Sequence, residues 1–158
     1  MALYDDDFYL WTQEQAAALR RLADQRANLP LDLANLAEEV EDLGKSEYAA
    51  LYGQLVRLLK HALKLEFSPA RDPRGDWQVS VLDARSQLAL RMTGAMRRRL
   101  LDDLARAYRD ARRQAAVELR SHGERLALPQ ECPYRLTDAL ADDWWPENRH
   151  GIVDEVSG

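Results

Sequence analysis

The sequence has few of the residues and segments that mark secreted and membrane proteins. Its single cysteine, Cys132, excludes an internal disulfide and is typical of a protein that stays in the reducing cytoplasm. No apolar run approaches the roughly 20 residues that a membrane-spanning helix needs. The acidic start, MALYDDD, lacks the basic residues that open a signal peptide. We therefore expect a cytoplasmic protein with no membrane partner.

The sequence also lacks the motifs of several well-known enzyme and metal-site classes. It has no glycine-rich phosphate loop, no Cys and His residues at zinc spacing and no nucleophile elbow. The paired Glu-x-x-His motifs of a di-iron bundle are absent. No recognised nucleic-acid motif appears, and the sequence pI near 5.2 argues against nucleic acid as a partner. The sequence predicts no cofactor and favours a protein that is not an enzyme.

What the chain does have is a composition suited to one packed core and an uneven charge distribution. It contains 158 residues, 46% of them hydrophobic and 31% charged. Residues 49–125 carry 16 basic and 9 acidic side chains, whereas the segments on either side are acidic. Oppositely charged segments of one chain can attract one another, which is a simpler explanation than binding to an external polyanion.

Apolar residues recur at three- and four-residue steps along most of the chain, as expected for amphipathic helices. This periodicity predicts an all-α fold, a mostly antiparallel bundle of about five helices with an N-terminal aromatic arm and a short C-terminal helix. Residues 1–146 are predicted to form a single helical domain. Residues 147–158 are expected to form a tail that packs on its own bundle or on a neighbouring molecule. The predicted helices cover about 12–28, 33–43, 46–67, 76–92 and 95–122, with a short one capped by Thr137.

Local signals set the expected ends of two of these helices. Thr12 to Gln15 resembles a capping box, in which a threonine and a glutamine satisfy each other's backbone N–H groups. Gly44 is expected to end one helix at a positive φ, and Ser46 is expected to cap the next.

A carboxylate and an imidazole suggest a first candidate site. Glu39 lies near the margin of one apolar stripe, and His61 lies at the edge of the apolar face of the next predicted helix. If these helices are neighbours, the two side chains can meet. They then form either a half-buried or solvated pair, or part of a metal or catalytic site that needs a third ligand.

Other candidates have weaker support. Asp5 and Asp7 belong to an acidic run that can ligate a cation, but the spacing of a calcium loop is missing, so an acidic cap on a basic neighbour is the simpler interpretation. Lys64 lies on the wet side of its predicted helix. Glu118 and His122 are four residues apart and share a helix face without further companions.

Four strings carry a resemblance to a known family: YDDDFYLW, NLAEEVEDLGKSE, LLKHALKLEF followed by SP, and ECPYRLTDAL with a later WWP. In this order they resemble domain-of-unknown-function family 29, an uncharacterised bacterial family, over about Tyr4 to Pro146. The resemblance implies a small, soluble, all-helical protein and brings no activity. The family's signature positions present here are Asp5, Asp7, Trp11, Glu38, Glu39, Glu41, Gly44, His61, Lys64, Cys132 and Pro133.

The expected function is therefore that of a non-enzymatic cytoplasmic protein that acts through protein–protein binding, with a protein partner or by self-association. The alternative is a metal-binding or hydrolytic enzyme with a site near Glu39 and His61. No catalytic set or metal ligands are assigned. The candidate ligand-contacting residues are Glu39, His61, Lys64, Asp5 and Asp7.

Overall fold

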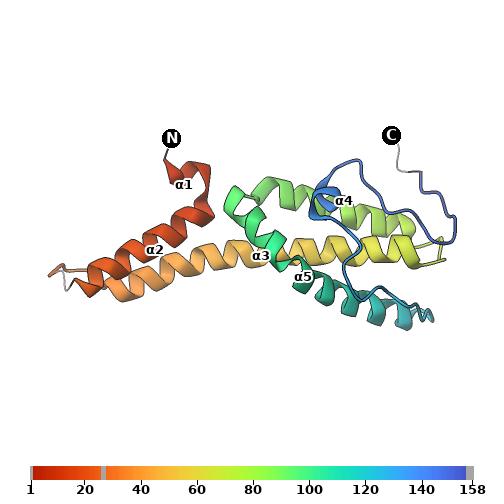
Figure 1. The fold of residues 1–158 in the computed structure, drawn as a ribbon, viewed down its shortest axis with the longest axis horizontal. Coiled ribbons are helices and arrows are strands. Elements are labelled where there is room, and N and C mark those ends of the chain that lie inside the picture. Colours follow the sequence, from red (N-terminus) through yellow and green to blue (C-terminus); the bar gives the residue numbers. More distant parts are fainter. Residues whose placement is uncertain (1, 26–27, 156–158) are drawn as a thin grey trace. The chain divides into compact units, whose positions relative to one another are not determined.

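Helices are the only regular elements in residues 2–25 and 28–155, the part of the chain that the computed structural model describes (Figure 1). The prediction of an all-α fold is confirmed. The chain divides into two compact units, residues 1–51 with 92–100 and residues 52–91 with 101–158. The helices are α1 (Leu3–Asp6), α2 (Phe8–Asp24), α3 (Leu33–Phe67), α4 (Arg74–Arg91), α5 (Gly94–Ser121) and α6 (Leu136–Leu140).

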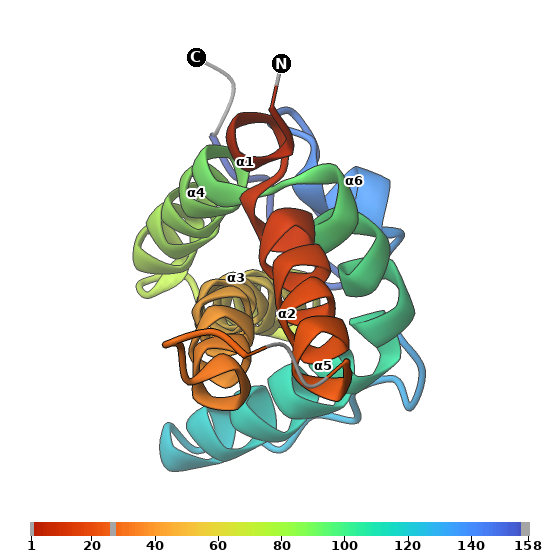
Figure 2. The ribbon, with the colours of Figure 1, turned by 90° about the vertical axis from the view of Figure 1, so that its left-hand side faces the viewer.

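In the first unit, α2 lies antiparallel to the first half of α3 (Figure 2). The rings of Tyr9 and Tyr48 have centroids 5.8 Å apart, and Arg20 forms an ion pair with Glu41 at 2.6 Å. The contact partners run in opposite directions along the two helices, as an antiparallel pair requires. Apolar side chains buried in this unit include Tyr9, Ala16, Leu33, Ala37, Tyr48 and Leu51.

Gly44 does not end a helix, because α3 runs without interruption from Leu33 to Phe67. The predicted break at Gly44 and the predicted cap at Ser46 were therefore wrong. A Cβ atom at position 44 would overlap the hydroxyl oxygen of Thr12 on α2. Thr12 is fully buried, and its hydroxyl donates to the carbonyl oxygen of Tyr9 at 2.7 Å. Glycine at position 44 thus allows α2 and α3 to approach closely.

Asp7, not Thr12, caps α2. The Asp7 carboxylate accepts a hydrogen bond from the backbone N–H of Leu10 at 2.9 Å, and its other oxygen accepts one from Ala95 in the first turn of α5 at 2.9 Å. The capping box predicted at Thr12 was wrong because α2 begins four residues earlier, at Phe8. One carboxylate therefore satisfies free N–H groups at two helix starts.

The predicted aromatic arm is not a separate segment, because α1 and the first turns of α2 contain it. The ring centroids of Tyr4 and Trp11 are 4.9 Å apart at an interplanar angle of 87°, and Phe8 lies 5.5 Å from Tyr4. Edge-to-face pairs of this kind are favourable beyond the area they bury. The three rings hold α1 against α2.

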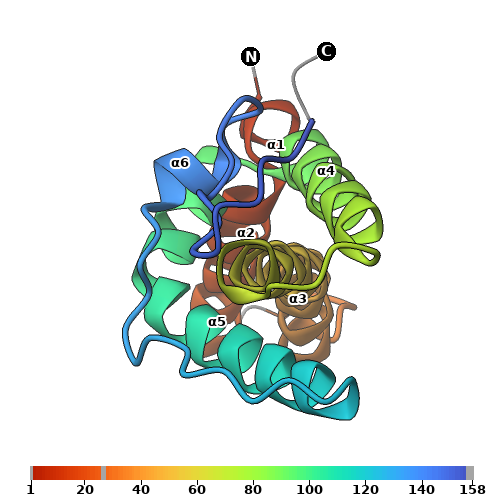
Figure 3. The same ribbon diagram turned by 90° about the vertical axis from the view of Figure 1, so that its right-hand side faces the viewer.

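In the second unit, α4 runs antiparallel to the second half of α3, and α5 runs parallel to it (Figure 3). Arg57 of α3 contacts Asp83 of α4 at 3.7 Å, and the hydroxyl of Tyr52 donates to Asp110 of α5 at 2.6 Å. Alanines on α5 let the helices approach closely. Buried core residues of this unit include Leu55, Leu58, Leu59, Leu63, Val81, Leu88, Ala107, Tyr108, Ala111, Ala115 and Leu119.

The segment after α6 packs on the C-terminal end of α3 and donates hydrogen bonds to its carbonyl groups (Figure 3). The buried amide of Asn148 donates to the carbonyl oxygens of Leu65 at 2.8 Å and Ser68 at 3.0 Å. Arg74 donates to the same Leu65 carbonyl at 2.8 Å and forms an ion pair with Asp154 at 2.6 Å. The last carbonyls of a helix have no partner within the helix, so these contacts satisfy them. The described part of the predicted tail therefore packs on its own chain.

Two helix starts lie a few residues from their predicted positions. α4 begins at Arg74, which places Asp76 in its first turn. α6 begins at Leu136 with Arg135 as its cap residue, so Thr137 lies inside the helix. Both differences are within the range in which helix ends are hard to define.

Candidate functional site

Lys64 belongs to a candidate site in the second unit. It projects from α3, and only 5% of the residue is exposed, so its predicted place on the wet side of the helix was wrong. Its ammonium group contacts the carboxylate of Glu118 on α5, and Lys60 contacts the other oxygen of that carboxylate at 2.9 Å. Two ammonium groups therefore share one carboxylate. A single carboxylate neutralises only one of them, so the cluster carries one excess positive charge.

A cavity of about 400 Å³ opens beside Lys64, and we call it the Lys64 pocket. The Lys64 ammonium lies 5.6 Å from the centroid of the Trp77 ring, within the range of a cation–π interaction. Most of the wall is apolar, and the volume is that of a typical small-ligand pocket. The pocket is lined by Lys64, Pro69, Ala70, Pro73, Trp77, Leu119, Glu118, His122 and Glu124.

The polar groups of the pocket are held in place by contacts with the rest of the unit. Glu124 accepts a hydrogen bond from the hydroxyl of Ser68 at 2.7 Å. His122 Nδ1 lies 2.9 Å from the carbonyl oxygen of Glu118. Burial raises the pKa of Glu118, but hydrogen bonds from Lys64 and Lys60 outweigh it, so its pKa lies below the ordinary value. Glu118 is therefore a carboxylate at neutral pH.

His61 lies three residues before Lys64 on α3 and is half-buried. Its Nδ1 atom is buried and has no hydrogen-bond partner within the described residues. Burial, with the nearby charges of Lys64 and Lys60, lowers the pKa of His61 to about 4. At neutral pH the imidazole is therefore uncharged. Protonating it places a third positive charge beside the two lysines.

This arrangement predicts that His61 makes the fold sensitive to mild acid. The pKa of His61 in the folded protein lies below its ordinary value of 6.5, so the unfolded chain binds the proton more readily between about pH 6.5 and pH 4. Stability is lost as the pH falls through this window. When the pH is lowered from about 7.5 to about 5, the free energy of unfolding should fall by about 1 to 2 kcal/mol more in wild type than in His61→Gln. Urea unfolding at both pH values measures this difference.

The exposed His122 provides the control for this experiment. His122→Gln makes the same chemical change at an exposed residue of the Lys64 pocket, so comparing it with His61→Gln shows whether the effect belongs to position 61. If His61→Gln loses as much stability in acid as wild type does, His61 is not the group responsible.

Glu39 does not share a site with His61. Both residues lie on α3 and are 22 positions apart, which corresponds to about 33 Å along one helix. Glu39 is exposed. The pairing considered from the sequence required two separate helices, and the continuous α3 removes that requirement.

The two N-terminal candidates differ from one another. Asp5 is exposed on α1. Asp7 caps two helices, and although burial opposes it, hydrogen bonds from Leu10 and Ala95 keep its pKa below the ordinary value. Within residues 2–25 and 28–155, no group of three or more His, Cys, Asp or Glu side chains is placed to hold a metal ion.

Several residues of the Lys64 pocket were missed as site residues in the sequence. Trp77 was not selected as a candidate, and Glu118 with His122 was interpreted as an isolated pair. The four-residue spacing of Glu118 and His122 was the available signal, but their companions Lys60 and Lys64 come from α3, more than 50 positions earlier. Cys132 is half-buried, and burial raises the pKa of its thiol, which fits a packed cysteine.

The fold and the site define an all-α protein with a ligand-sized pocket between three helices. A sequence model described as "Domain of unknown function DUF29" matches residues 3–145, so the chain belongs to that family. This confirms the resemblance found in the motif strings. No helix in the described part of the chain has the length and apolar character to cross a membrane.

A solved structure supports the fold. The crystal structure of an α-helical protein of unknown function from Rhodospirillum rubrum is similar to this chain, with a TM-score of 0.77 and 26% sequence identity. The match covers 91% of this chain and 92% of that one. The comparison with curated proteins gave no match.

Proposed function

We propose that the protein is a non-enzymatic cytoplasmic protein that acts through protein–protein binding, and that the Lys64 pocket receives an apolar side chain of the partner. The observation that carries this proposal is a pocket with both apolar and charged lining residues. The lining combines the apolar Pro69, Pro73 and Trp77 with the charged Lys64 and Glu118. An apolar wall with a few fixed polar groups is the usual composition of a binding site.

The charge of the lining indicates the chemistry of the bound group. Lys60 and Lys64 share the carboxylate of Glu118, while Glu124, the other carboxylate of the lining, accepts a hydrogen bond from Ser68, so a carboxylate of the partner can pair with the second ammonium group. The indole of Trp77 offers a flat face to an aromatic ring. The proposed occupant is therefore an aromatic or large apolar side chain with a carboxylate close to it, as at the C-terminal end of a protein chain.

A small probe tests the pocket directly. Hydrocinnamate carries a phenyl ring and a carboxylate, and hydrocinnamamide is its uncharged counterpart. Titration followed by tryptophan fluorescence should give saturable binding of hydrocinnamate to wild type and at least tenfold weaker binding of the amide. Tenfold corresponds to about 1.4 kcal/mol, which is reasonable for one partly buried charge contact. Trp77→Phe identifies the fluorescence signal as that of Trp77.

Two variants separate binding from folding. Ala70→Leu is expected to fill the pocket without changing any charge, and Lys64→Met removes the ammonium while Glu118 keeps Lys60 as a partner. Both should bind hydrocinnamate at least tenfold more weakly. An immobilised wild-type protein should retain a partner from lysate that Ala70→Leu does not retain and that hydrocinnamate displaces. If hydrocinnamate binds wild type and Ala70→Leu equally, or if no retained protein differs, the proposal is wrong.

A further inference from the structure

The helix α3 contains two internal glycines, and the fold explains only one of them. Gly44 is required by the contact with Thr12. Gly53 is exposed, and a Cβ atom built on it has no neighbour within 4 Å. Glycine inside a helix weakens it relative to alanine, because glycine loses more backbone freedom on folding. Packing gives no reason for glycine at position 53, so we looked at the space above it.

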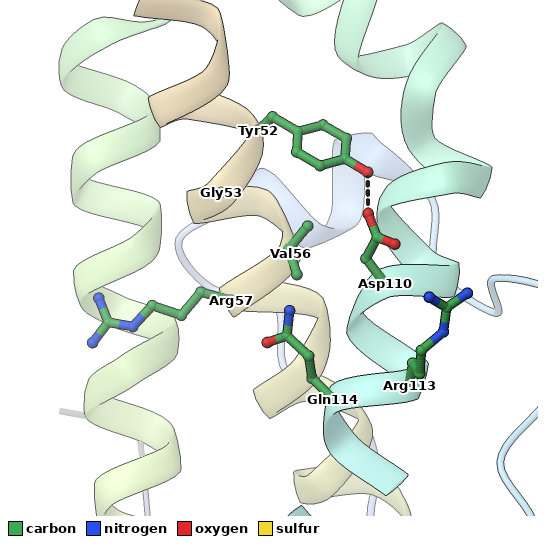
Figure 4. Close-up of a pocket in the computed structure, with 7 residues that line it drawn as sticks. All are labelled: Tyr52, Gly53, Val56, Arg57, Asp110, Arg113 and Gln114. Atoms are coloured by element: carbon green, nitrogen blue, oxygen red, sulfur yellow. Dashed lines mark hydrogen bonds between the residues drawn. The ribbon is translucent and has the colours of Figure 1, made fainter. Parts of the chain in front are cut away.

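That space is a second pocket of about 330 Å³ in the second unit, and we call it the Gly53 pocket. Figure 4 shows it in the groove between α3 and α5, with Val56 and Gln114 on facing sides. A side chain at position 53 would project into open space at this pocket. The lining residues are Tyr52, Gly53, Val56, Arg57, Asp110, Arg113 and Gln114.

Two residues that line the Gly53 pocket, Tyr52 and Asp110, already contact each other. The Tyr52 hydroxyl donates to Asp110 at 2.6 Å (Figure 4), and the Arg106 guanidinium lies 4.6 Å from the centroid of the Tyr52 ring. Burial, followed by the hydrogen bond to Asp110, raises the pKa of Tyr52 to about 12. The phenol therefore stays protonated and keeps donating to Asp110, which satisfies part of that carboxylate.

The two arginines that line the pocket make weaker contacts with the rest of the protein than Tyr52 and Asp110 do. In Figure 4 Arg57 extends toward α4 and Arg113 stands on the opposite side of the pocket, with their guanidinium groups pointing away from the centre. Arg57 makes a 3.7 Å contact with Asp83, whose side chain is 61% exposed, so this ion pair is weak. Arg113 is exposed and has no ion pair or hydrogen bond within residues 2–25 and 28–155. Each arginine side chain has several rotatable bonds, so rotation about them can turn a guanidinium toward the pocket without moving a helix.

We propose that the Gly53 pocket binds a small oxyanion, a carboxylate or a phosphate monoester, carried on an apolar body. The body lies over Gly53 and against Val56, where the missing side chain leaves room. The oxyanion lies at the mouth, within reach of Arg57, Arg113 and the amide of Gln114. Guanidinium groups suit both carboxylate and phosphate because their N–H donors match the paired oxygens of these anions. This inference does not depend on the Lys64 pocket.

Phenyl phosphate, inorganic phosphate and phenethylamine are titrated into wild type by calorimetry, whereas hydrocinnamate, which is also proposed to bind in the Lys64 pocket, is titrated into Ala70→Leu. Phenyl phosphate or hydrocinnamate should bind at least tenfold more tightly than inorganic phosphate, which lacks the apolar body. The better of the two identifies the phosphate or the carboxylate as the natural group. Phenethylamine has the opposite charge, and binding as tight as that of the anions would overturn the proposal.

The variants distinguish this pocket from the Lys64 pocket. Gly53→Leu is expected to fill the Gly53 pocket and should weaken phenyl phosphate binding at least tenfold, while Ala70→Leu in the Lys64 pocket should leave it unchanged. Leucine favours helix, so thermal unfolding should find Gly53→Leu at least as stable as wild type. Arg113→Gln should weaken binding at least threefold and reduce its dependence on salt. Equal binding of phenyl phosphate by wild type and Gly53→Leu would overturn the proposal. So would the absence of both phenyl phosphate binding by wild type and hydrocinnamate binding by Ala70→Leu.

Discussion

Replacing Arg85 by methionine is expected to lower the free energy of unfolding by about 3 to 5 kcal/mol. The buried guanidinium of Arg85 on α4 donates to the carbonyl oxygens of Ala139 at 2.9 Å, Asp142 at 3.4 Å and Trp144 at 2.5 Å. Methionine fills much of the same volume but donates no hydrogen bond, so these carbonyls lose their donor. Hydrogen bonds from a charged group contribute about 1.5 to 3 kcal/mol each, and the saved cost of burying the charge offsets part of their sum.

The contact of Arg85 with two tryptophans adds to the expected loss. Its guanidinium carbon lies 5.0 Å from the Trp145 ring centroid and 6.0 Å from that of Trp144. Such cation–π contacts contribute about 0.5 to 2 kcal/mol. The near-ultraviolet circular dichroism of the variant should change as well, because the tryptophans lose a fixed neighbour.

Urea unfolding followed by far-ultraviolet circular dichroism measures this prediction, and the same helix provides its control. Arg91 is exposed at the end of α4, so Arg91→Met should change stability by less than about 0.5 kcal/mol. Arg85→Lys should fall between wild type and Arg85→Met, because an ammonium group cannot reach three carbonyls with a planar fork. Equal stability of Arg85→Met and Arg91→Met would show that the carbonyl contacts do not stabilise the fold.

Alanine at the two glycines of α3 is expected to change stability in opposite directions. Gly44→Ala should lower the free energy of unfolding by about 1 to 3 kcal/mol, because the new Cβ overlaps Thr12, which is fully buried and cannot move aside. Gly53→Ala should raise it by about 0.5 to 1 kcal/mol, because its Cβ enters open space and alanine favours helix. The two variants carry the same chemical change at two positions of one helix.

Thermal and urea unfolding of both variants measure the difference, and a third substitution tests its cause. Thr12→Ala removes the hydroxyl that the new Cβ would overlap. In that background, Gly44→Ala should cost less than it does in wild type, as expected for two residues in contact. If Gly44→Ala destabilises equally in both backgrounds, contact with Thr12 is not the reason for glycine at position 44.

The sequence predicted the helical fold well, because the spacing of apolar residues records which face of each helix is buried. It failed at Gly44, where glycine looked like a helix end. A single glycine costs a helix only about 1 kcal/mol, and the packing of a long helix outweighs that cost. The reason for the glycine lies in Thr12, 32 positions earlier, which local patterns do not record.

The same limit applies to the candidate sites. His61 and Lys64 could be selected from one helix, but Glu118 and Trp77 reach them only through folding. Asp7 belonged to an acidic run with no visible target, and its second partner, Ala95, is 88 positions away. Residue type and spacing therefore indicated candidate site residues, while long-range packing determined which of them are in contact.

The hydrogen bonds that satisfy the C-terminal end of α3 come from a distant segment, which has a consequence for synthesis on the ribosome. Asn148, which is made about 80 residues later, donates to the carbonyl of Leu65 in the last turn of α3 and to that of Ser68 just after the helix. Until that segment has left the exit tunnel, the nascent helix lacks the Asn148 donor, Arg74 is the nearby donor to the Leu65 carbonyl, and the last turn can fray. Contacts so distant in sequence form slowly compared with local ones, so the second unit is expected to reach its final structure only after its C-terminal segment emerges.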